Sequence, residues 1–357
     1  MSNERLQQIE SLLINTSLKW LLDIKFFIIA GGKTGSSTLS ASFINGLHSH
    51  GTCELWCVYP YLRSQNITLK DLIDYSYYKQ KKKPLLISTY REPLSRTISS
   101  FFENINTYVD LRKINNLGLM ELIYFFNKNY LLNLENYHPF LDVNDFGNLN
   151  ILNTPFDKNK GYQYYENDKV RALILRFDKI NEWDTIIKTH LDDIERNYYN
   201  FRIDNLSKNK WYYNLYCQFQ QNYFVKSDTL DQKFKLHENL MNYFYNSTDI
   251  QTIKNSWIKY VNKFSSCKIP DDFNWKIYLA YNGDLPYNNE LDCLHHWVIR
   301  GHGENRIYNI NIPPKFKWKE YLQLNPDLPA NGINDENKAI HHWIFNGYKE
   351  KRKYCIQ

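Results

Sequence analysis

Residues 26–39 read FFIIAGGKTGSSTL, and this stretch decides the fold of the 357-residue chain. The apolar run over residues 26–30 is typical of a strand that is buried on both faces. Gly31 and Gly32 allow a tight turn in which the backbone can approach a ligand closely. Residues 36–38 then begin a helix, whose first N–H groups have no partner within the helix and can bind an anion. A strand, a polar turn and a helix start in this order predict a phosphate-binding loop.

A second stretch with the same arrangement follows at residues 85–100 and reads LLISTYREPLSRTISS. Its apolar part predicts a second buried strand, and Pro93 suits the first turn of a helix. Arg91 offers a planar fork that can bind a phosphate through two hydrogen bonds. Ser99 lies eight residues after Arg91, about two helical turns further on. Because the carboxyl ends of parallel strands meet at one edge of a sheet, we expect the two motifs to hold two phosphates of one nucleotide.

The first motif differs from the ATP- and GTP-binding loop. That loop places Gly-Lys-Ser/Thr five residues after its first glycine, whereas Lys33 comes before Gly35. The order Lys-Thr-Gly-Ser-Ser-Thr resembles the 5′-phosphosulfate loop of sulfotransferases that use 3′-phosphoadenosine 5′-phosphosulfate (PAPS). That family binds the 3′-phosphate with an arginine at the end of a second strand and a serine eight residues later, which Arg91 and Ser99 match. Glu92 departs from the Asp or Asn that the family has next to this arginine.

Further stretches are similar to a bacterial branch of this fold that is assigned to capsular polysaccharide synthesis. Residues 153–162 carry its Pro-Phe-Asp and Gly-Tyr pairs, and residues 170–180 carry a strand followed by Asp-Lys-Ile. Residues 244–257 are similar to its closing helices. The resemblance covers about residues 22–265. It implies the sulfotransferase fold, an α/β architecture with a P-loop-like parallel sheet flanked by helices.

The resemblance also implies the cofactor, which is PAPS as sulfuryl donor with no metal required. Main-chain N–H groups of the first loop would hold the 5′-phosphate, and Arg91 and Ser99 would hold the 3′-phosphate. Lys33 would stabilise the bridging oxygen of the leaving 3′,5′-diphosphate. The donor-binding residues expected on this basis are Gly32, Lys33, Thr34, Gly35, Ser36, Ser37, Thr38, Arg91 and Ser99.

The catalytic base is expected just after the loop helix, because in this family a His or Glu reaches the sulfate from the following element. His50 is the first candidate, His48 the second and Glu54 the third. An imidazole titrates near neutral pH and suits proton abstraction. If this segment is extended, His48 and His50 share one face of it. His138 is a further candidate from outside this segment.

These features favour a sulfotransferase that moves a sulfuryl group from PAPS to a hydroxyl of a carbohydrate or glycan acceptor. The carbohydrate preference rests on the capsule branch and on appended repeats. One alternative is a non-catalytic nucleotide- or glycan-binding protein on the same fold. The other is an ATP-dependent kinase, which is disfavoured because the Lys-Ser/Thr end of the ATP loop is missing. The sequence does not name the acceptor.

Composition narrows the class of protein. Hydrophobic residues make up 43% and charged residues 23%, which is typical of a globular protein. The chain has 44 Lys and Arg against 38 Asp and Glu, a net charge of +6 that suits an anionic cofactor. Its densest basic run, residues 79–83, is short. It is more consistent with a solvent-exposed segment that leads into the next strand than with a nucleic-acid-binding surface. We therefore expect no nucleic-acid partner.

The N-terminal residues 1–24 are polar and then amphipathic, without the basic and apolar segments of a signal peptide. The chain has no apolar run of 18 residues, so no membrane span is expected. A cytoplasmic location with free thiols follows as the expectation. Cys53 and Cys57 are four residues apart, but no second pair completes a zinc site.

Strands expected at residues 25–30, 85–89 and 170–176 are separated by helices, which predicts a parallel α/β sheet. A further short strand is possible between the first loop helix and Cys57. A loop is expected over residues 136–162. Residues 33–47 are expected to form the loop and the helix that follows it. The other expected helices cover residues 5–22, 68–80, 93–105, much of 108–135 and most of 181–265.

The chain changes character after residue 267, so we expect a catalytic domain over residues 1–267 and a small, mainly helical repeat region over 268–357. Two tandem repeats, about residues 271–310 and 314–353, have Trp275 and Trp318 in equivalent positions 43 residues apart. Each repeat then reaches a His-His-Trp sequence. Adjacent histidines on a helix point about 100° apart and chelate a metal poorly, so packing roles are favoured over a metal site. The repeats could bind a glycan or a protein partner.

Overall fold

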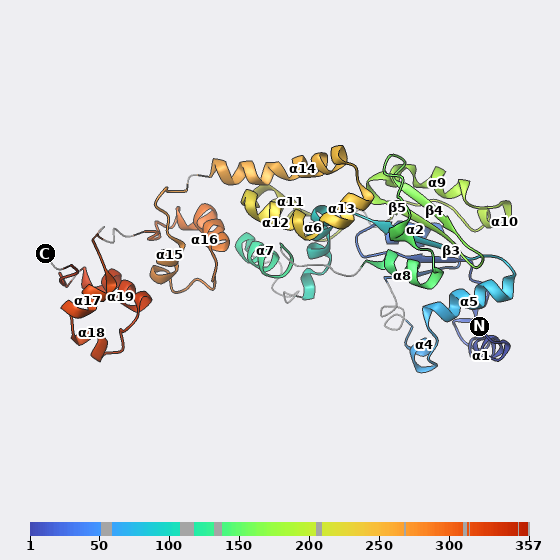
Figure 1. Cartoon of the computed structure of the whole chain (residues 1–357), viewed down its shortest axis with the longest axis horizontal. Coiled ribbons are helices and arrows are strands. Elements are labelled where there is room, and N and C mark those ends of the chain that lie inside the picture. The colour runs from blue at the N-terminus through green and yellow to red at the C-terminus, as the bar shows by residue number, and fades with distance from the viewer. Residues whose placement is uncertain are drawn as a thin grey trace. The chain divides into compact units, whose positions relative to one another are not determined.

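The chain forms two compact units in the computed structural model (Figure 1). The first comprises Met1–Asn115, Lys128–Cys217 and Ser227–Lys259. The second comprises Asn116–Asn127, Gln218–Lys226 and Tyr260–Gln357. The structure describes residues 1–50, 59–107, 118–131, 138–204, 209–267, 269–309, 313, 315–348 and 350–355.

A mostly parallel sheet forms the centre of the first unit. Its strands are β1 (Phe26–Ile29), β2 (Gly46–Ser49), β3 (Leu85–Tyr90), β4 (Tyr162–Glu166) and β5 (Arg171–Arg176). They lie in the order β2-β1-β3-β5-β4. Only β4, at one edge, runs antiparallel to its neighbour β5. The prediction of an α/β architecture with a parallel sheet flanked by helices is thereby confirmed at the level of fold class.

The register of the sheet places the ends of three strands side by side. Phe26 in β1 pairs with Leu85 in β3, and Leu85 pairs with Arg171 in β5. Every residue of β1 and β3 is buried, as the continuous apolar runs predicted. The segments that leave the carboxyl ends of β1, β3 and β5 therefore lie at one edge of the sheet, where parallel α/β folds bind their ligands.

Helices cover both faces of this sheet (Figure 1). One face packs into a core with α2 (Ser36–Ser42) and α9 (Trp183–Thr189), whose Trp183 is fully buried. The helix α8 (Pro139–Gly147) contacts β1, β3 and β5. On this second face the ring of Phe140 lies 6.3 Å from that of Tyr90, centroid to centroid.

The other helices of the first unit have bounds close to those expected. The helix α6 (Pro93–Glu103) begins at the proline that the sequence placed in its first turn. A capping box between Thr68 and Asp71 starts α5 (Leu69–Gln80). The remaining ones are α10 (Asp193–Arg196), α12 (Ser227–Leu236) and α13 (Glu238–Phe244), with α11 (Tyr213–Asn222) and α14 (Ser247–Ser266), of which residues 213–217 and 247–259 belong to this unit. The exception is α4 (Pro60–Ser64), where no helix was expected.

Three sequence expectations were wrong in detail. The loop expected over residues 136–162 contains the helix α8, because Phe140 and Val143 are buried and Pro139 opens its first turn. The N-terminal helix expected to residue 22 is α1 (Asn3–Leu13), followed by a separate 3₁₀ turn. The helix expected to residue 47 ends at Ser42, and β2 follows.

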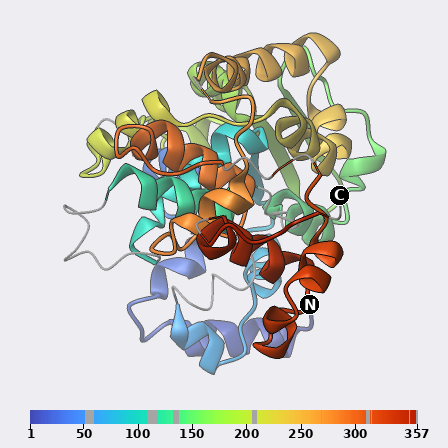
Figure 2. The same cartoon turned by 90° about the vertical axis from the view of Figure 1, so that its left-hand side faces the viewer.

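In the second unit the two repeats have similar local structures, and the second has one more short helix. The first contains α15 (Trp275–Tyr281), α16 (Glu290–His296) and a π-helical turn, Trp297–Gly301. The second contains α17 (Trp318–Leu324), α18 (Asp327–Ala330), α19 (Glu336–His342) and a π-helical turn, Trp343–Gly347. These helices are drawn in orange and red in Figure 2. A further helix of this unit is α7 (Leu119–Phe126).

A tyrosine–histidine hydrogen bond lies inside each repeat. Tyr278 Oη is 2.6 Å from His296 Nδ1, and Tyr321 Oη is 2.8 Å from His342 Nδ1. The second histidine of each His-His pair is therefore held within its own repeat. A Cβ at Gly301 would lie 2.1 Å from Tyr278 Oη, so the tyrosine hydroxyl requires glycine there.

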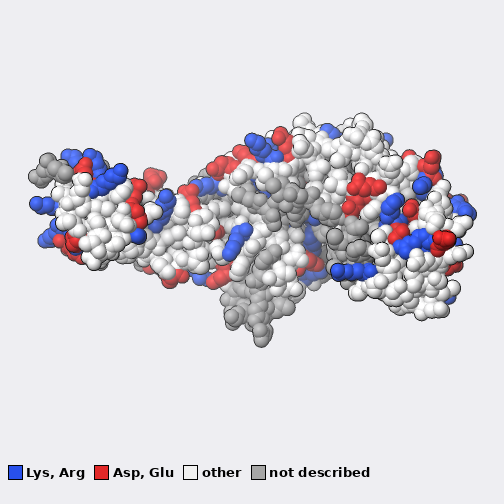
Figure 3. Space-filling view, turned by 60° about the horizontal axis from the view of Figure 1, so that its bottom comes forward, with Lys and Arg blue, Asp and Glu red and all other residues white. Residues whose placement is uncertain are grey.

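On the face seen in Figure 3, the coloured basic and acidic side chains are interspersed rather than gathered by sign. Across the described ranges, no helix combines the length and hydrophobicity that crossing a bilayer requires.

Glu195 on α10 tests the contribution of buried ion pairs to this fold. Its side chain is 1% exposed and accepts a hydrogen bond of 2.5 Å from Arg171 Nη2. Glu195→Gln leaves the largely buried guanidinium of Arg171 without its counter-charge. We expect the free energy of unfolding to fall by about 3 kcal/mol, measured by urea denaturation followed by circular dichroism.

Asp193→Asn is the matched control on the same helix. The Asp193 side chain is 98% exposed, and its pair with Arg196 lies in water. This variant should leave the free energy of unfolding nearly unchanged. If both variants lose the same free energy of unfolding, burial of the Glu195–Arg171 ion pair contributes nothing to stability.

Candidate functional site

The loop that follows β1 has a strained backbone. Lys33 has a φ of 63° and Gly35 a φ of 93°, both in the left-handed region. A Cβ at Gly35 would lie 2.5 Å from the ring of Trp183. That ring is held in place because Trp183 Nε1 donates a hydrogen bond of 3.0 Å to the carbonyl of Arg176. Glycine is therefore required at position 35 by both the backbone conformation and the packing.

Two hydroxyl groups at the end of β3 fasten this loop to the sheet. Ser88 Oγ donates to the carbonyl of Ile29 at 2.5 Å. Thr89 Oγ1 donates to Thr34 Oγ1 at 2.6 Å, and Thr34 Oγ1 donates in turn to the carbonyl of Gly31 at 2.5 Å. All three hydroxyl-bearing residues are buried. The loop is thus tied to its neighbouring strand on both sides of its glycine pair.

Two arginines from the second motif bind successive carbonyls of the loop. Arg91 Nη1 donates to the carbonyl of Lys33 at 2.8 Å, and Arg96 Nε donates to the carbonyl of Gly32 at 3.1 Å. Arg91 Nε also donates to Ser95 Oγ at 3.0 Å. The two sequence motifs are therefore joined directly, by charge-assisted hydrogen bonds.

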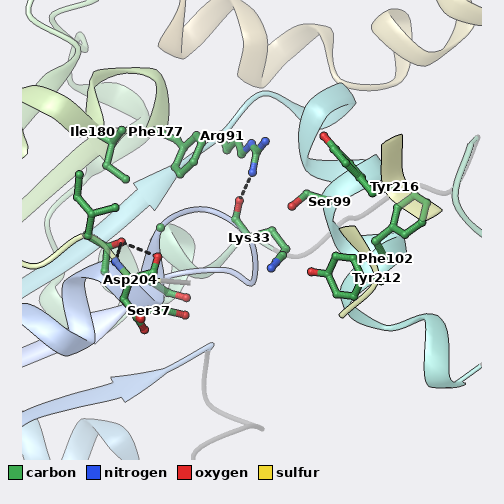
Figure 4. A pocket seen from close by; sticks show the side chains of 14 residues that line it. Lys33, Ser37, Arg91, Ser99, Phe102, Phe177, Ile180, Asp204, Tyr212 and Tyr216 are labelled. Atoms are coloured by element: carbon green, nitrogen blue, oxygen red, sulfur yellow. Dashed lines mark hydrogen bonds between the residues drawn. The ribbon is translucent and has the colours of Figure 1, made fainter. Parts of the chain in front are cut away.

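A pocket of about 210 Å³ opens where these elements meet (Figure 4). Seven of the residues expected to bind the donor line it, and they come from both motifs: Lys33, Gly35, Ser36, Ser37, Thr38, Arg91 and Ser99.

The other two expected donor-binding residues do not line this pocket. Gly32 offers its carbonyl to Arg96, and the imidazole of His50 lies 3.8 Å from where a Cβ of Gly32 would be. Thr34 is 3% exposed and uses its hydroxyl in the contacts with Thr89 and Gly31. Both residues shape the loop in this structure.

Lys33 is paired within the pocket wall. Its Nζ donates to Glu103 Oε2 at 3.0 Å, and the same carboxylate accepts from Tyr212 Oη at 2.5 Å and from Lys210 Nζ at 3.4 Å. Partial burial favours the protonated form of Glu103. The hydrogen bonds from Tyr212 and Lys33 outweigh it and lower the pKa of Glu103 to about 2. The carboxylate of Glu103 is therefore ionised at neutral pH. It holds the ammonium group of Lys33, a residue that lines the pocket.

Arg91 is half-buried against the ring of Phe177, with its guanidinium carbon 4.3 Å from the ring centroid. Desolvation lowers the pKa of Arg91 from its usual value of 12.5. Glu92, next in the chain, acts in the opposite direction and favours the charged form. A rigid guanidinium that faces both the loop and the pocket suits recognition of a phosphate.

The base candidates lie beside the loop. His50 Nε2 is 3.3 Å from Ser36 Oγ, and the ring centroids of His48 and His50 are 4.7 Å apart, as expected for extended backbone. Burial, followed by the nearby His50, lowers the pKa of His48 to about 4. Glu54 lies outside the described residues. Neither histidine lines the pocket, so the structure brings His50 to the loop but not into the cavity.

His138 is buried as well. Burial, followed by the charge of Arg96, lowers its pKa to about 4. It does not line the pocket of Lys33 and Arg91.

Several lining residues were missed at the sequence level. Phe177 and Ile180 follow β5, and the same rule that places ligands at the carboxyl ends of strands could have found them. Phe102 lies on α6 three residues after Ser99, so helical periodicity could have found it. The rest come from a distant segment with no motif of its own: Ile203, Asp204, Tyr212 and Tyr216.

Figure 4 shows how the pocket walls differ. Phe102, Tyr212 and Tyr216 form one side, and Asp204 and Ser37 lie together at the opposite end. The main chain of Asp204 is held there, because its N–H donates to Thr38 Oγ1 at 3.2 Å. The pocket thus combines two cationic side chains, hydroxyl groups and an aromatic wall.

Among the described residues, no cluster of three or more His, Cys, Asp or Glu side chains is placed to share a metal ion. Comparison of the chain with protein-family models, with curated proteins and with solved structures gives no match.

Gly35→Ala tests the strained loop. The new methyl group would meet the Trp183 ring, and alanine disfavours a φ of 93°. We expect a loss of about 1–3 kcal/mol in the free energy of unfolding, measured by chemical denaturation. Gly32→Ala is the control, because the nearest atom to its added Cβ would be 3.8 Å away. A Gly35→Ala protein as stable as wild type would contradict the described loop conformation.

Proposed function

We propose that the chain is a PAPS-dependent sulfotransferase with the sulfotransferase fold, which transfers a sulfuryl group to a hydroxyl of a carbohydrate acceptor. One observation carries this proposal: Lys33 from the first motif and Arg91 and Ser99 from the second line the same pocket. The nucleotide of PAPS carries phosphate at both its 5′ and 3′ positions. A site for it needs two separate groups of donors, and the two motifs supply one each.

The loop would bind the 5′-phosphosulfate. Lys33 and the hydroxyl of Ser37 face the same pocket, and the helix α2 directs its first N–H groups toward the loop. Arg91 and Ser99 would bind the 3′-phosphate from the other motif. The aromatic wall of Phe102, Tyr212 and Tyr216 offers apolar surface to the nucleoside.

The chemistry follows from the position of Lys33. An acceptor oxygen forms a bond to sulfur while the bond between sulfur and the bridging phosphate oxygen breaks, and 3′,5′-diphosphate leaves. Lys33 would stabilise the charge that develops on the bridging oxygen. The ammonium of Lys33 is paired with Glu103, so donor binding would compete with that ion pair. The proton of the acceptor hydroxyl would pass to a base, for which His50 is the first candidate.

The direct test is calorimetric binding of 3′-phosphoadenosine 5′-phosphate, with ATP and 5′-AMP as competitors. We expect micromolar binding that depends on the 3′-phosphate. Both Arg91→Ala and Ser99→Ala should weaken it, Arg91→Ala by about tenfold or more, because a charge-assisted hydrogen bond is lost. Equal binding of ATP, or no binding by the wild type, would refute the proposal.

Ser100→Ala is the matched control for Ser99→Ala. Ser100 is the next residue on α6, but it does not line the pocket and its hydroxyl is 3.5 Å from the side chain of Asn104. Its removal should leave nucleotide affinity unchanged. Arg91 also holds the loop, so the Arg91→Ala variant can lose affinity because the loop changes its structure. A comparison of Ser99→Ala with Ser100→Ala shows whether affinity falls through loss of a phosphate contact alone.

Turnover is tested separately from binding. Release of 3′,5′-diphosphate from PAPS is measured with a panel of hydroxyl-rich polysaccharides, for the wild type, His50→Ala and His48→Ala. Loss of a general base lowers kcat by about 10²–10⁴-fold, so we expect a loss in this range for His50→Ala with nucleotide affinity kept. Full activity in His50→Ala would exclude it as the base. Nucleotide binding without turnover on any acceptor would favour the non-catalytic alternative.

A further inference from the structure

Two adjoining cavities lie in the repeat region of the second unit. The first has a volume of about 390 Å³ and lies where α15 of the first repeat meets α19 of the second. The other has a volume of about 520 Å³ and lies within the second repeat, between α17 and α19. Ile340 lines both cavities. Together they form the repeat groove, with Trp275 and Asn337 in its first part and Trp318 and Glu336 in its second. Both volumes lie within the range of about 300–1,000 Å³ that ligand sites have.

Contacts between the two repeats fix the walls of this groove. Ile277 from α15 joins the apolar cluster that contains Tyr321 of the second repeat. Tyr281 Oη donates a hydrogen bond of 2.6 Å to the carbonyl of Ile344. The ring of Tyr281 also stacks on that of Phe345, with 4.4 Å between the centroids. The repeats are therefore packed together, and the groove between them has walls that a ligand could meet already formed.

The same pair of tryptophan and lysine lines each cavity. Trp275 and Trp318 occupy equivalent positions 43 residues apart in the two repeats. The ammonium of Lys276 lies 5.8 Å from the ring centroid of Trp275. The ammonium of Lys319 lies 5.4 Å from the ring centroid of Trp318. Both tryptophans are half-buried, and both lysines are exposed. The groove thus offers two flat apolar surfaces, each with a cation at its side.

Polar side chains surround these apolar surfaces. Asn337 and His341 are exposed, lie four residues apart on one face of α19 and line the first cavity. Glu336 lines the second cavity, where Lys317 Nζ donates to Glu320 Oε1 at 2.8 Å. Of the described residues that line the groove, three are lysines and two are glutamates. The groove therefore carries hydrogen-bond donors and acceptors with little excess of either charge.

We propose that the repeat groove binds a carbohydrate chain, with one sugar ring at Trp275 and another at Trp318. A sugar ring has an apolar C–H face, which suits an indole ring, and a rim of hydroxyl groups that both donate and accept hydrogen bonds. Two equivalent tryptophans in one groove suit a polymer of similar units better than a single small molecule.

The charges and polar groups of the groove disfavour two other classes of ligand. Nucleic acid requires a basic surface for its phosphates, and the lysines and glutamates here nearly balance. Proline-rich segments also pack on aromatic rings, but proline lacks an N–H group. Such a segment would offer few donors to the carboxylate of Glu336, whereas sugar hydroxyls would supply them.

This site is independent of the proposed transfer reaction. Its described residues belong to the second unit, and none of them lines the pocket of Lys33 and Arg91. If that reaction acts on a glycan, a chain bound at the repeats would be present at a raised local concentration for the same molecule.

The first experiment measures binding of oligosaccharides to the full chain by calorimetry. The probes are cellohexaose, maltohexaose, chitohexaose and a hyaluronan hexasaccharide, and a proline-rich peptide represents the competing class. We expect at least one hexasaccharide to bind, and its disaccharide to bind about tenfold more weakly, because only the longer chain can reach both tryptophans. Binding of the peptide in place of every oligosaccharide, or of none of the probes, would overturn the proposal.

Variants then test whether the groove is the site. Trp275→Ala and Trp318→Ala should each weaken hexasaccharide binding by about tenfold, because each removes the surface for one sugar ring. Asn337→Ala should weaken it by about threefold or more, through loss of a hydrogen bond. Asn346→Ala is the matched control, since Asn346 is exposed in the same repeat but lines neither cavity, and its affinity should equal that of the wild type.

Both tryptophans also pack against the apolar clusters of their repeats, so Tm is measured for each variant. If a tryptophan variant does not fold, the exposed pair Asn337→Ala and Asn346→Ala still decides the question. Unchanged hexasaccharide affinity in Asn337→Ala and in every folded tryptophan variant would show that the chain binds elsewhere. Ser99→Ala, which tests the nucleotide pocket, should keep its hexasaccharide affinity, so the two proposals can fail separately.

Discussion

The hydrogen bonds between the loop after β1 and the segment after β3 are the constraint on which the candidate site depends. Arg91 and Arg96 bind the carbonyls of Lys33 and Gly32, while Ser88 and Thr89 fasten the flanking residues. Without these bonds the loop would relax at Lys33, because a left-handed conformation costs free energy in a residue other than glycine. Since both partners leave the ends of neighbouring parallel strands, the sheet itself brings the two motifs into register.

Charged side chains lie on two sides of the hydrogen bonds between Arg91, Arg96 and the loop. On the pocket side, the carboxylate of Glu103 pairs with Lys33 and Lys210 and holds both ammonium groups in place. Arg91, Arg96 and Lys233 line a second cavity of about 10 Å³. Arg91 lines both this cavity and the pocket of Lys33 and Ser99, so the position of its side chain bears on both.

The sequence predicted the elements whose signal lies within a few consecutive residues, and it missed those that depend on contacts with distant parts of the chain. The strands β1, β3 and β5 were found because each is a continuous apolar run between polar turns. The helix α8 was missed, because its turn-forming Asn and Asp residues and a glycine obscured the burial of Phe140 and Val143. The edge strand β4 was missed because its alternation is weak, and only pairing with β5 makes it a strand. In the repeats, the periodic Trp and His positions were visible, whereas the tyrosine–histidine hydrogen bonds were not.

For the site, the sequence by itself determined that glycine, lysine and hydroxyl residues follow one buried strand and that Arg91 and Ser99 follow another at a spacing of eight residues, because both motifs are local in the chain. It also determined the class of fold, through the period of its apolar residues. Only the tertiary structure decided that Lys33 pairs with Glu103, that Trp183 makes Gly35 obligatory, and which distant aromatic rings line the pocket. These contacts join residues far apart in the chain, so they depend on how the elements pack, and no local pattern encodes them.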